Sequence, residues 1–208
     1  MARFVLVHGA WHGGWCFQAL VSALARRGHG VHAPDLPSDA PGLTPHDYAA
    51  VIGPQPDAIV VGHSLGAQTI PFVAARLRVH LGGVLPVENV YRESFAEGFG
   101  GFVRDASGRS YWPDLDTAAA RLYPDCTRDV AEWAFPRLRP QAPFDPVVAP
   151  LEGDVVVATM RDAAIDGEWQ SRTGAAQGAS VIELDVGHFP FLTDPEQLAE
   201  ILGSLASA

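Results

Sequence analysis

The segment Ala58-Ile-Val-Val-Gly-His-Ser-Leu-Gly66 is the strongest indication of the fold in this sequence. Four apolar residues lead into a G-x-S-x-G sequence with Ser64 at its centre. This pattern is typical of a sharp turn between a strand and a helix that exposes a serine Oγ. Glycines two residues to either side let the helix pass close to the strand, and the amide of Leu65 would face a developing oxyanion. An ordinary glycine-rich turn has the same composition, so the interpretation depends on the flanking strand and helix.

Short apolar runs elsewhere in the chain predict further strands. They are Phe4–Val7, Gly30–Ala33, Leu81–Val87, Val155–Ala158 and Val181–Leu184. Most are apolar at consecutive positions, which is typical of strands buried on both faces of a parallel sheet.

Helical patterns fall between several of these runs. They cover three segments: Phe17–Arg27, Leu65–Leu77 and Thr193–Leu205. The first is followed by Gly28, a C-cap signal, and the last opens with a Thr-Asp-Pro-Glu capping box. Strands that alternate with helices predict an α/β fold, with a mostly parallel sheet of about six strands flanked by helices.

The segment 88–149 breaks this rhythm because it is rich in proline, glycine and aromatic residues. It is too long for a simple loop. We therefore expect residues 1–87 and 150–208 to form the core, and residues 88–149 to form a short helical cap over the carboxyl edge of the sheet.

The loop after the first strand, His8-Gly9-Ala10-Trp11, predicts a second oxyanion donor. In this context an H-G pair turns the chain so that a backbone N–H faces the nucleophile. Ala10 is the expected donor and Trp11 is the alternative. We expect His8 to brace the loop rather than to take part in chemistry.

A general base and its orienting acid are predicted from position in the chain. His188 follows the last strand and precedes the final helix, where it could accept the proton of Ser64. The acid should follow the preceding strand, which favours Asp162 and leaves Asp166 as the main rival. Asp185 lies on the strand side of His188 and is expected to be structural.

Composition excludes several classes of protein. The 208 residues carry a formal net charge of −10, which argues against nucleic acid and against anionic membrane surfaces. No apolar run approaches 18 residues and no signal peptide is visible. Cys16 and Cys126 lack metal-ligand spacing and are expected to be reduced thiols, so no metal and a cytoplasmic location are predicted. We further expect no cofactor, and a monomer or homodimer.

Four segments of the sequence resemble a known family. Phe4–Phe17 (FVLVHGAWHGGWCF), Val60–Ala67 (VVGHSLGA), Leu122–Gln141 and Gly187–Leu202 (GHFPFLTDPEQLAEIL) are similar to the plant methylesterase and hydroxynitrile-lyase family and its bacterial esterase relatives. The resemblance implies the α/β-hydrolase fold with a cap. It also implies a triad of Ser64, Asp162 and His188, and an oxyanion hole at the Ala10 and Leu65 amides.

The resemblance also bears on the choice between esterase and lyase. Lyases of this family carry a threonine after the first histidine of the loop and a lysine directly after the catalytic histidine. Here those positions hold Gly9 and Phe189, and a phenylalanine cannot hold departing cyanide by charge. Both departures favour hydrolysis of an ester or a related acyl bond.

Aromatic residues concentrate in the expected cap and near the mouth of the site. They include Trp11, Trp15, Phe95, Phe99, Phe102, Tyr111, Trp112, Trp133, Phe189 and Phe191. Together they suggest an apolar cleft, for which we select Trp11, His12, Trp112, Trp133 and Phe189 as lining residues.

The resulting hypothesis is a serine hydrolase that cleaves a small or medium, largely apolar carboxylic ester. The alternatives are a lyase, cyclase or cofactor-free oxygenase on the same scaffold, or a slow-turnover ligand-binding protein.

Overall fold

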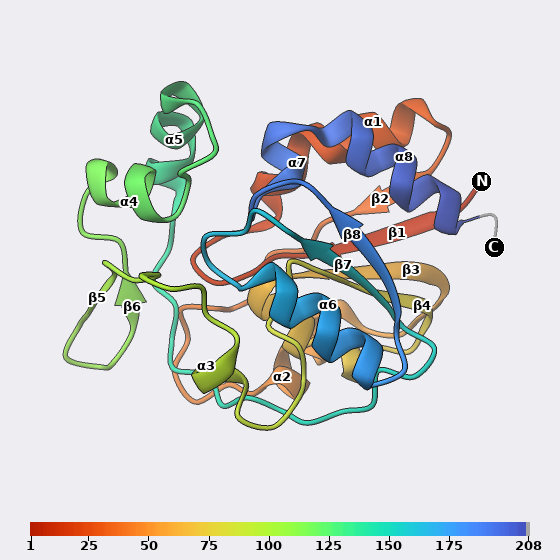
Figure 1. Cartoon of the computed structure of the whole chain (residues 1–208), viewed down its shortest axis with the longest axis horizontal. Helices are drawn as coiled ribbons and strands as arrows, with labels where there is room; N and C mark the ends of the chain where they lie inside the picture. The colour runs from red at the N-terminus through yellow and green to blue at the C-terminus, as the bar shows by residue number, and fades with distance from the viewer. Residues whose placement is uncertain (207–208) are drawn as a thin grey trace.

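The computed structural model, which describes residues 1–206, contains a main sheet of six strands (Figure 1). Their order across the sheet is β2-β1-β3-β4-β7-β8, and all neighbouring pairs are parallel. In chain order the strands are β1 (Arg3–Val7), β2 (Gly30–His32), β3 (Gln55–His63), β4 (Ala75–Leu81), β7 (Val155–Thr159) and β8 (Ser180–Leu184). The predicted α/β fold with a parallel sheet of about six strands is confirmed.

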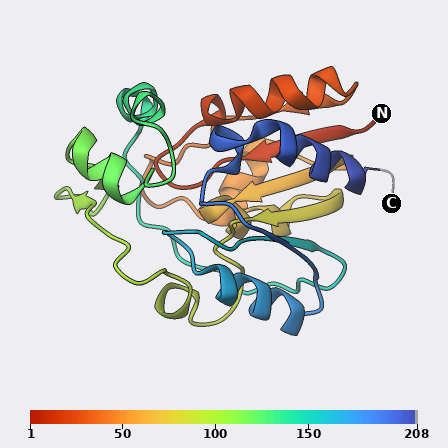
Figure 2. The ribbon, with the colours of Figure 1, turned by 45° about the horizontal axis from the view of Figure 1, so that its top comes forward.

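Helices cover both faces of this sheet (Figures 1 and 2). One face packs against α1 (Gln18–Arg26), α7 (Pro190–Thr193) and α8 (Pro195–Leu205), and the other against α2 (Pro45–Ile52) and α6 (Gly167–Ala176). Alternate residues of one strand therefore enter different apolar clusters. In β1, for example, Leu6 packs with the α1 and α8 side chains and Val7 packs with those of α2. This two-sided burial explains why the strand sequences are apolar at consecutive positions.

The segment after the nucleophile differs from the predicted helix over Leu65–Leu77. Only two 3₁₀ turns form, η2 (Ser64–Gln68) and η3 (Ile70–Phe72), before the chain becomes extended at Val73. Pro71 contributes to the difference because it lacks the N–H that a continuous helix would bond to the Ala67 carbonyl, and its ring would clash with that carbonyl.

The fourth strand is correspondingly displaced from its predicted position. β4 ends at Leu81, where Leu81–Val87 was expected to begin the strand. Its first half carries Arg76 and Arg78, so an apolar run does not mark where it starts. Gly82, with a φ of +52°, then turns the chain at the carboxyl edge of the sheet.

The final helix is also capped one residue later than predicted. Thr193 ends α7, and Asp194 is the N-cap of α8, its side chain accepting a hydrogen bond from the Gln197 amide. A carboxylate at the N-cap satisfies a free N–H of the first turn as a threonine would.

Between β4 and β7 the chain leaves the sheet and forms short elements beyond the carboxyl ends of the strands (Figure 1). These are α3 (Val90–Glu93), the antiparallel ribbon β5 (Val103–Arg104) and β6 (Ser110–Tyr111), α4 (Leu115–Arg121), α5 (Arg128–Ala134) and η4 (Phe135–Arg137). The remaining 3₁₀ turn, η1 (Gly14–Phe17), leads into α1. The extended pieces of this segment were not expected from its sequence, and they contribute side chains to the site described next. No helix within residues 1–206 is long and apolar enough to cross a bilayer.

Candidate active site

Ser64 lies at the end of β3 in a strained turn. Its φ of +51° is in the left-handed region, which is uncommon for a residue other than glycine. A Cβ at Gly62 would lie 2.8 Å from the Gly66 carbonyl oxygen, and one at Gly66 would lie 2.6 Å from the Val7 carbonyl oxygen. Both glycines of the G-x-S-x-G sequence are therefore required by the close approach of neighbouring backbone, which presents Ser64 at the sheet edge.

The loop after β1 passes directly against this serine. A Cβ at Gly9 would lie 2.7 Å from the Ser64 Cβ and 3.2 Å from its Oγ, so position 9 has no room for a side chain. Ala10 follows, and both Ala10 and Leu65 line the cavity that contains Ser64. No hydrogen bond to another part of residues 1–206 engages the N–H of either residue. Two free backbone donors thus border the nucleophile.

His188 and Asp162 form a buried pair beneath the same cavity. The Nδ1–H of His188 donates to the Asp162 Oδ2 across 2.7 Å, which leaves the imidazole Nε2 as the free nitrogen. Asp162 Oδ1 accepts from the amides of Ala164 at 2.7 Å and Ile165 at 2.9 Å. Oδ2 also accepts from the Thr159 hydroxyl at 2.7 Å. These donors fix the position and orientation of the carboxylate.

The two rival carboxylates lie elsewhere. Asp166 is the N-cap of α6, and its side chain accepts from the Trp169 amide at 2.7 Å. Asp185 is exposed and pairs with Arg161. Of the three candidates, only Asp162 contacts His188.

Three further histidines surround this centre and bind backbone or phenol groups. The Nε2–H of His63 donates to the His188 carbonyl across 2.9 Å, and the two rings lie 4.6 Å apart. His12 Nδ1–H donates to the Ala10 carbonyl, and its Nε2 accepts from the Tyr123 hydroxyl at 2.7 Å. His8 Nε2 accepts from the Leu36 amide at 2.9 Å, as expected of a residue that braces the loop.

Burial keeps these three rings neutral. It lowers the pKa of His8 to about 4 and that of His12 to about 3, and it places the pKa of His63 well below its ordinary value. Neutral imidazoles can accept as well as donate, which the bonds to Leu36 and Tyr123 require. The sequence placed His63 beside Ser64, but nothing in its pattern signalled the contact with the His188 backbone.

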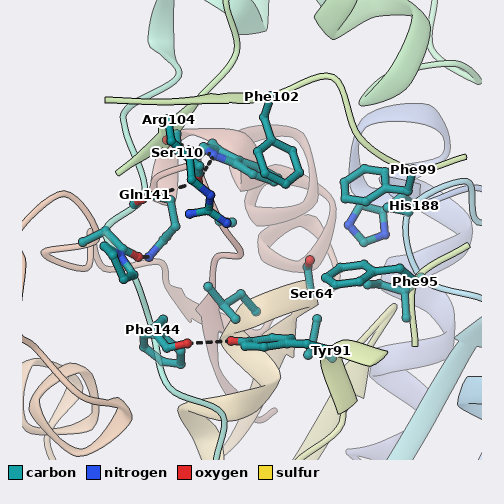
Figure 3. A pocket seen from close by; sticks show the side chains of 18 of the residues that line it. Ser64, Tyr91, Phe95, Phe99, Phe102, Arg104, Ser110, Gln141, Phe144 and His188 are labelled. Atoms are coloured by element: carbon teal, nitrogen blue, oxygen red, sulfur yellow. Dashed lines mark hydrogen bonds between the residues drawn. The ribbon is translucent and has the colours of Figure 1, made fainter. Parts of the chain in front are cut away.

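A cavity of about 350 Å³ opens above Ser64 (Figure 3). Its walls are largely aromatic, and they include Trp11, Tyr91, Phe95, Phe99, Phe102 and Phe144. Tyr91, Phe95 and Phe99 stack in a row, with ring centroids 6.1 Å and 5.7 Å apart. Arg104, Gln141 and Asp145 add polar groups.

Of the five pocket residues selected from the sequence, the structure places only Trp11 at this wall. Trp112 lies behind Trp11 with a centroid distance of 5.4 Å, and Trp133 packs on Trp15. His12 and Phe189 are buried against each other beneath the site. The wall residues that the selection missed lie in α3, in the ribbon and in extended segments, where no periodic pattern reports orientation.

Comparison with known proteins places the chain in a family. The profile of the Alpha/beta hydrolase family matches residues 4–201. The chain belongs to the alpha/beta hydrolase family. The resemblance inferred from the motifs is thereby confirmed at the level of fold and family.

Individual relatives fall within the same group. A carbendazim hydrolyzing esterase from Nocardioides is 41% identical over 90 residues, which cover 37% of this chain and 37% of that protein. The matched part thus spans about a third of that curated relative. Norfluorocurarine synthase 2 from Strychnos nux-vomica is 27% identical over 98% of this chain and 95% of its own. The crystal structure of a methylesterase from Arabidopsis superposes with a TM-score of 0.76 at 20% identity, covering 100% of this chain and 99% of that one, which shows the shared fold.

Proposed function

We propose that this alpha/beta hydrolase is a carboxylic-ester hydrolase that acts through Ser64, His188 and Asp162 on small or medium, largely apolar esters. One observation carries the proposal. The buried 2.7 Å contact between His188 Nδ1 and Asp162 Oδ2 lies at the same cavity as a serine held in a strained turn. A base that is oriented by a carboxylate next to an exposed serine is the arrangement that activates a hydroxyl for acyl transfer.

In the proposed reaction Ser64 Oγ attacks the ester carbonyl carbon while His188 Nε2 takes its proton. The Ala10 and Leu65 amides donate to the oxyanion of the tetrahedral intermediate. Collapse of the intermediate breaks the C–O bond to the alcohol, and His188 returns the proton to the departing oxygen. Water then attacks the acyl-enzyme by the same route and releases the acid.

The cavity supports an apolar substrate. Its aromatic walls match the apolar character of most small-molecule sites. Relatives named as a carbendazim hydrolyzing esterase, a pyrethroid hydrolase and a methylesterase support an acyl-bond substrate. Residues 88–149, which supply the outer wall, are proposed to act as the cap.

A cyanide-releasing lyase is disfavoured on two grounds. Position 9 has no space for the threonine of the lyases, since even a Cβ would lie 2.7 Å from Ser64. The sequence also contains no lysine, and the position directly after His188, where those enzymes carry the lysine that holds cyanide, is Phe189.

A fluorophosphonate probe tests the proposal directly. We expect intact-mass detection to show one adduct on the wild type and none on Ser64→Ala, and we expect turnover of short-chain esters to disappear in the same variant. A folded wild type that forms no adduct and turns over no ester would overturn the proposal and favour a ligand-binding protein.

A further inference from the structure

Arg104 is a cation in the wall of an otherwise largely apolar cavity. Among the residues that line the cavity, Arg104 supplies a guanidinium and Asp145 a carboxyl group, and most of the others are aromatic or aliphatic. The chain as a whole has a net charge of −10, so an arginine at this wall is not part of a general basic surface.

The side chain of Arg104 is held in place without being neutralised. It ends β5, directly opposite Ser110 of β6. One Nη donates to the Gly108 carbonyl across 3.1 Å, and the guanidinium carbon lies 5.7 Å from the centroid of the Phe102 ring. The ion pairs found among residues 1–206 do not include Arg104. Donors of its planar fork therefore stay available to a ligand.

The turn that supports Arg104 is itself ordered. Asp105 accepts from the Ser107 hydroxyl and amide and from the Arg109 amide and guanidinium, at 2.6 to 3.1 Å. This network fixes the carbonyl of Gly108, to which Arg104 is bonded. The guanidinium is thus partly pre-organised, which lowers the entropy lost when it binds an anion.

The position of Arg104 relative to Ser64 assigns it to one half of the substrate. Figure 3 shows His188, Phe95 and Phe99 on one side of Ser64, and Arg104 and Gln141 on the other. His188 must protonate the departing alcohol, so the alcohol lies on the side of His188. The acyl group then extends toward Arg104.

Asp145 acts on Tyr91 and is not paired with Arg104. It follows Phe144, whose carbonyl accepts a hydrogen bond from Tyr91 at 2.9 Å, and the electrostatic effect of Asp145 is one of the causes that raise the pKa of Tyr91. Figure 3 shows Tyr91 and Phe144 apart from Arg104, and the ion pairs within residues 1–206 do not join Asp145 to Arg104.

We propose that Arg104 binds a carboxylate at the far end of the acyl group, so that the preferred substrates are monoesters of dicarboxylic acids with an apolar spacer. This proposal rests on the proposed ester hydrolysis and adds the substrate class. The guanidinium fork matches a carboxylate in geometry and charge, and the aromatic walls match the spacer.

A matched pair of chromogenic substrates tests the preference. The mono-4-nitrophenyl ester of adipic acid and 4-nitrophenyl hexanoate have acyl chains of equal length that end in a carboxylate and a methyl group. We expect Arg104→Gln to lower kcat/KM for the anionic ester by about tenfold and that for the neutral ester by less than about twofold. Arg104→Glu should lower the anionic value further, and added salt should reduce the wild-type preference.

Arg92→Gln is the control, because Arg92 is an exposed arginine of α3 in the same segment of the chain, and it neither lines the cavity nor belongs to the ribbon that holds Arg104. It should leave the ratio of the two kcat/KM values unchanged. If Arg104→Gln leaves the ratio of the two kcat/KM values unchanged, whether both values fall equally or neither falls, the assignment of Arg104 is overturned.

Binding separates this proposal from the proposed function. Adipic acid monoamide and hexanamide resemble the two esters but are not expected to be hydrolysed, and calorimetry can compare their affinities in wild type and Arg104→Gln. If the wild type hydrolyses neither ester yet binds the anionic amide more tightly, and Arg104→Gln removes that preference, ester hydrolysis fails and the Arg104 site stands. Equal affinities in the wild type would contradict the site itself.

Discussion

The two sides of the cavity are built in different ways. Beneath it, Ser64, Asp162 and His188 come from loops at the carboxyl ends of three parallel strands, and buried hydrogen bonds hold the Asp162–His188 pair. Above it, the wall comes from short elements between β4 and β7, where Tyr91 and Phe95 are 37% and 43% exposed. A substitution on the lower side would disturb the hydrogen bonds that position the Asp162–His188 pair. A substitution among the partly exposed side chains of the upper side would change the folding free energy less. We infer that chemistry resides in the first region and selectivity in the second.

Replacing the acid of the lower region, Asp162, should reduce activity most. Asp162→Asn replaces the acceptor that holds His188 Nδ1–H, so the imidazole can adopt the wrong tautomer, and kcat should fall by roughly 10³- to 10⁴-fold. Asp166→Asn is the matched control because asparagine is also a good N-cap, and it should keep activity within about twofold. Steady-state kinetics on both variants would assign the acid to Asp166 if the two results were reversed.

A methyl group at Gly9 should have the next largest effect. The added Cβ would meet the Ser64 Cβ at 2.7 Å, so the serine or the Ala10 loop must shift, and kcat/KM should fall by about 100-fold. Gly28→Ala provides the comparison, since Gly28 has a φ of +81° and open space around it. That variant should lose about 1 kcal/mol of unfolding free energy and keep its activity. Full activity in Gly9→Ala would show that the loop is not tightly placed against Ser64.

The buried histidines predict a stability that falls in mild acid. The folded-state pKa values of His8 and His12, about 4 and about 3, lie below the ordinary value of 6.5, so the unfolded chain binds more protons as the pH drops below 6.5. Stability is therefore complete above pH 6.5 and declines toward pH 4, by roughly 2 kcal/mol per histidine between pH 6.5 and 5.

Urea unfolding at pH 7.5, 6 and 5 would measure this decline. His12→Gln removes one of the titrating groups, so its unfolding free energy should depend less steeply on pH than that of the wild type. An equal pH dependence in the two proteins would mean that the pKa of His12 is the same in the folded and the unfolded chain, against the prediction.

A smaller effect on catalysis is expected from His63, which acts on the site through the backbone of His188. His63→Ala removes the donor to the His188 carbonyl, and kcat should fall by about tenfold with little change in KM. His63→Gln can still donate and should recover part of the loss. His80→Ala is the control because His80 is equally buried but bonds Asp154, away from the cavity, so it should lose stability without this effect on kcat. Equal losses of kcat in the two alanine variants would assign His63 a general structural role.

The same division separates what could be predicted from the sequence from what could not. The residues singled out around Ser64, His188 and Asp162 lie where strand ends meet, and sequence order alone brings parallel strand ends to one edge. The prediction of a helix over Leu65–Leu77 was wrong, because Pro71 interrupts the helical hydrogen bonds that the run of small apolar residues would otherwise allow. Trp112 and Trp133 were selected for the pocket as large aromatics, but they pack behind the wall. The residues that do form the wall stand on irregular backbone, for which no period indicates which way a side chain points.

The smallest effect should come from the exposed row of aromatic rings. Phe95 is 43% exposed and stacks on Tyr91 and Phe99, so Phe95→Ala removes the buried part of one ring and should lower the unfolding free energy by about 1 to 2 kcal/mol. Phe95 and Phe99 lie on the side of His188, where the alcohol of the proposed substrate is placed. The variant should therefore lower kcat/KM for esters of bulky aromatic alcohols by a few fold and leave methyl esters of the same acid almost unchanged. Comparing the two esters within one acyl series isolates the alcohol side from the Arg104 side. An equal loss on both esters would place Phe95 among the residues that support the chemistry. That result would contradict the inference that the upper region determines selectivity alone.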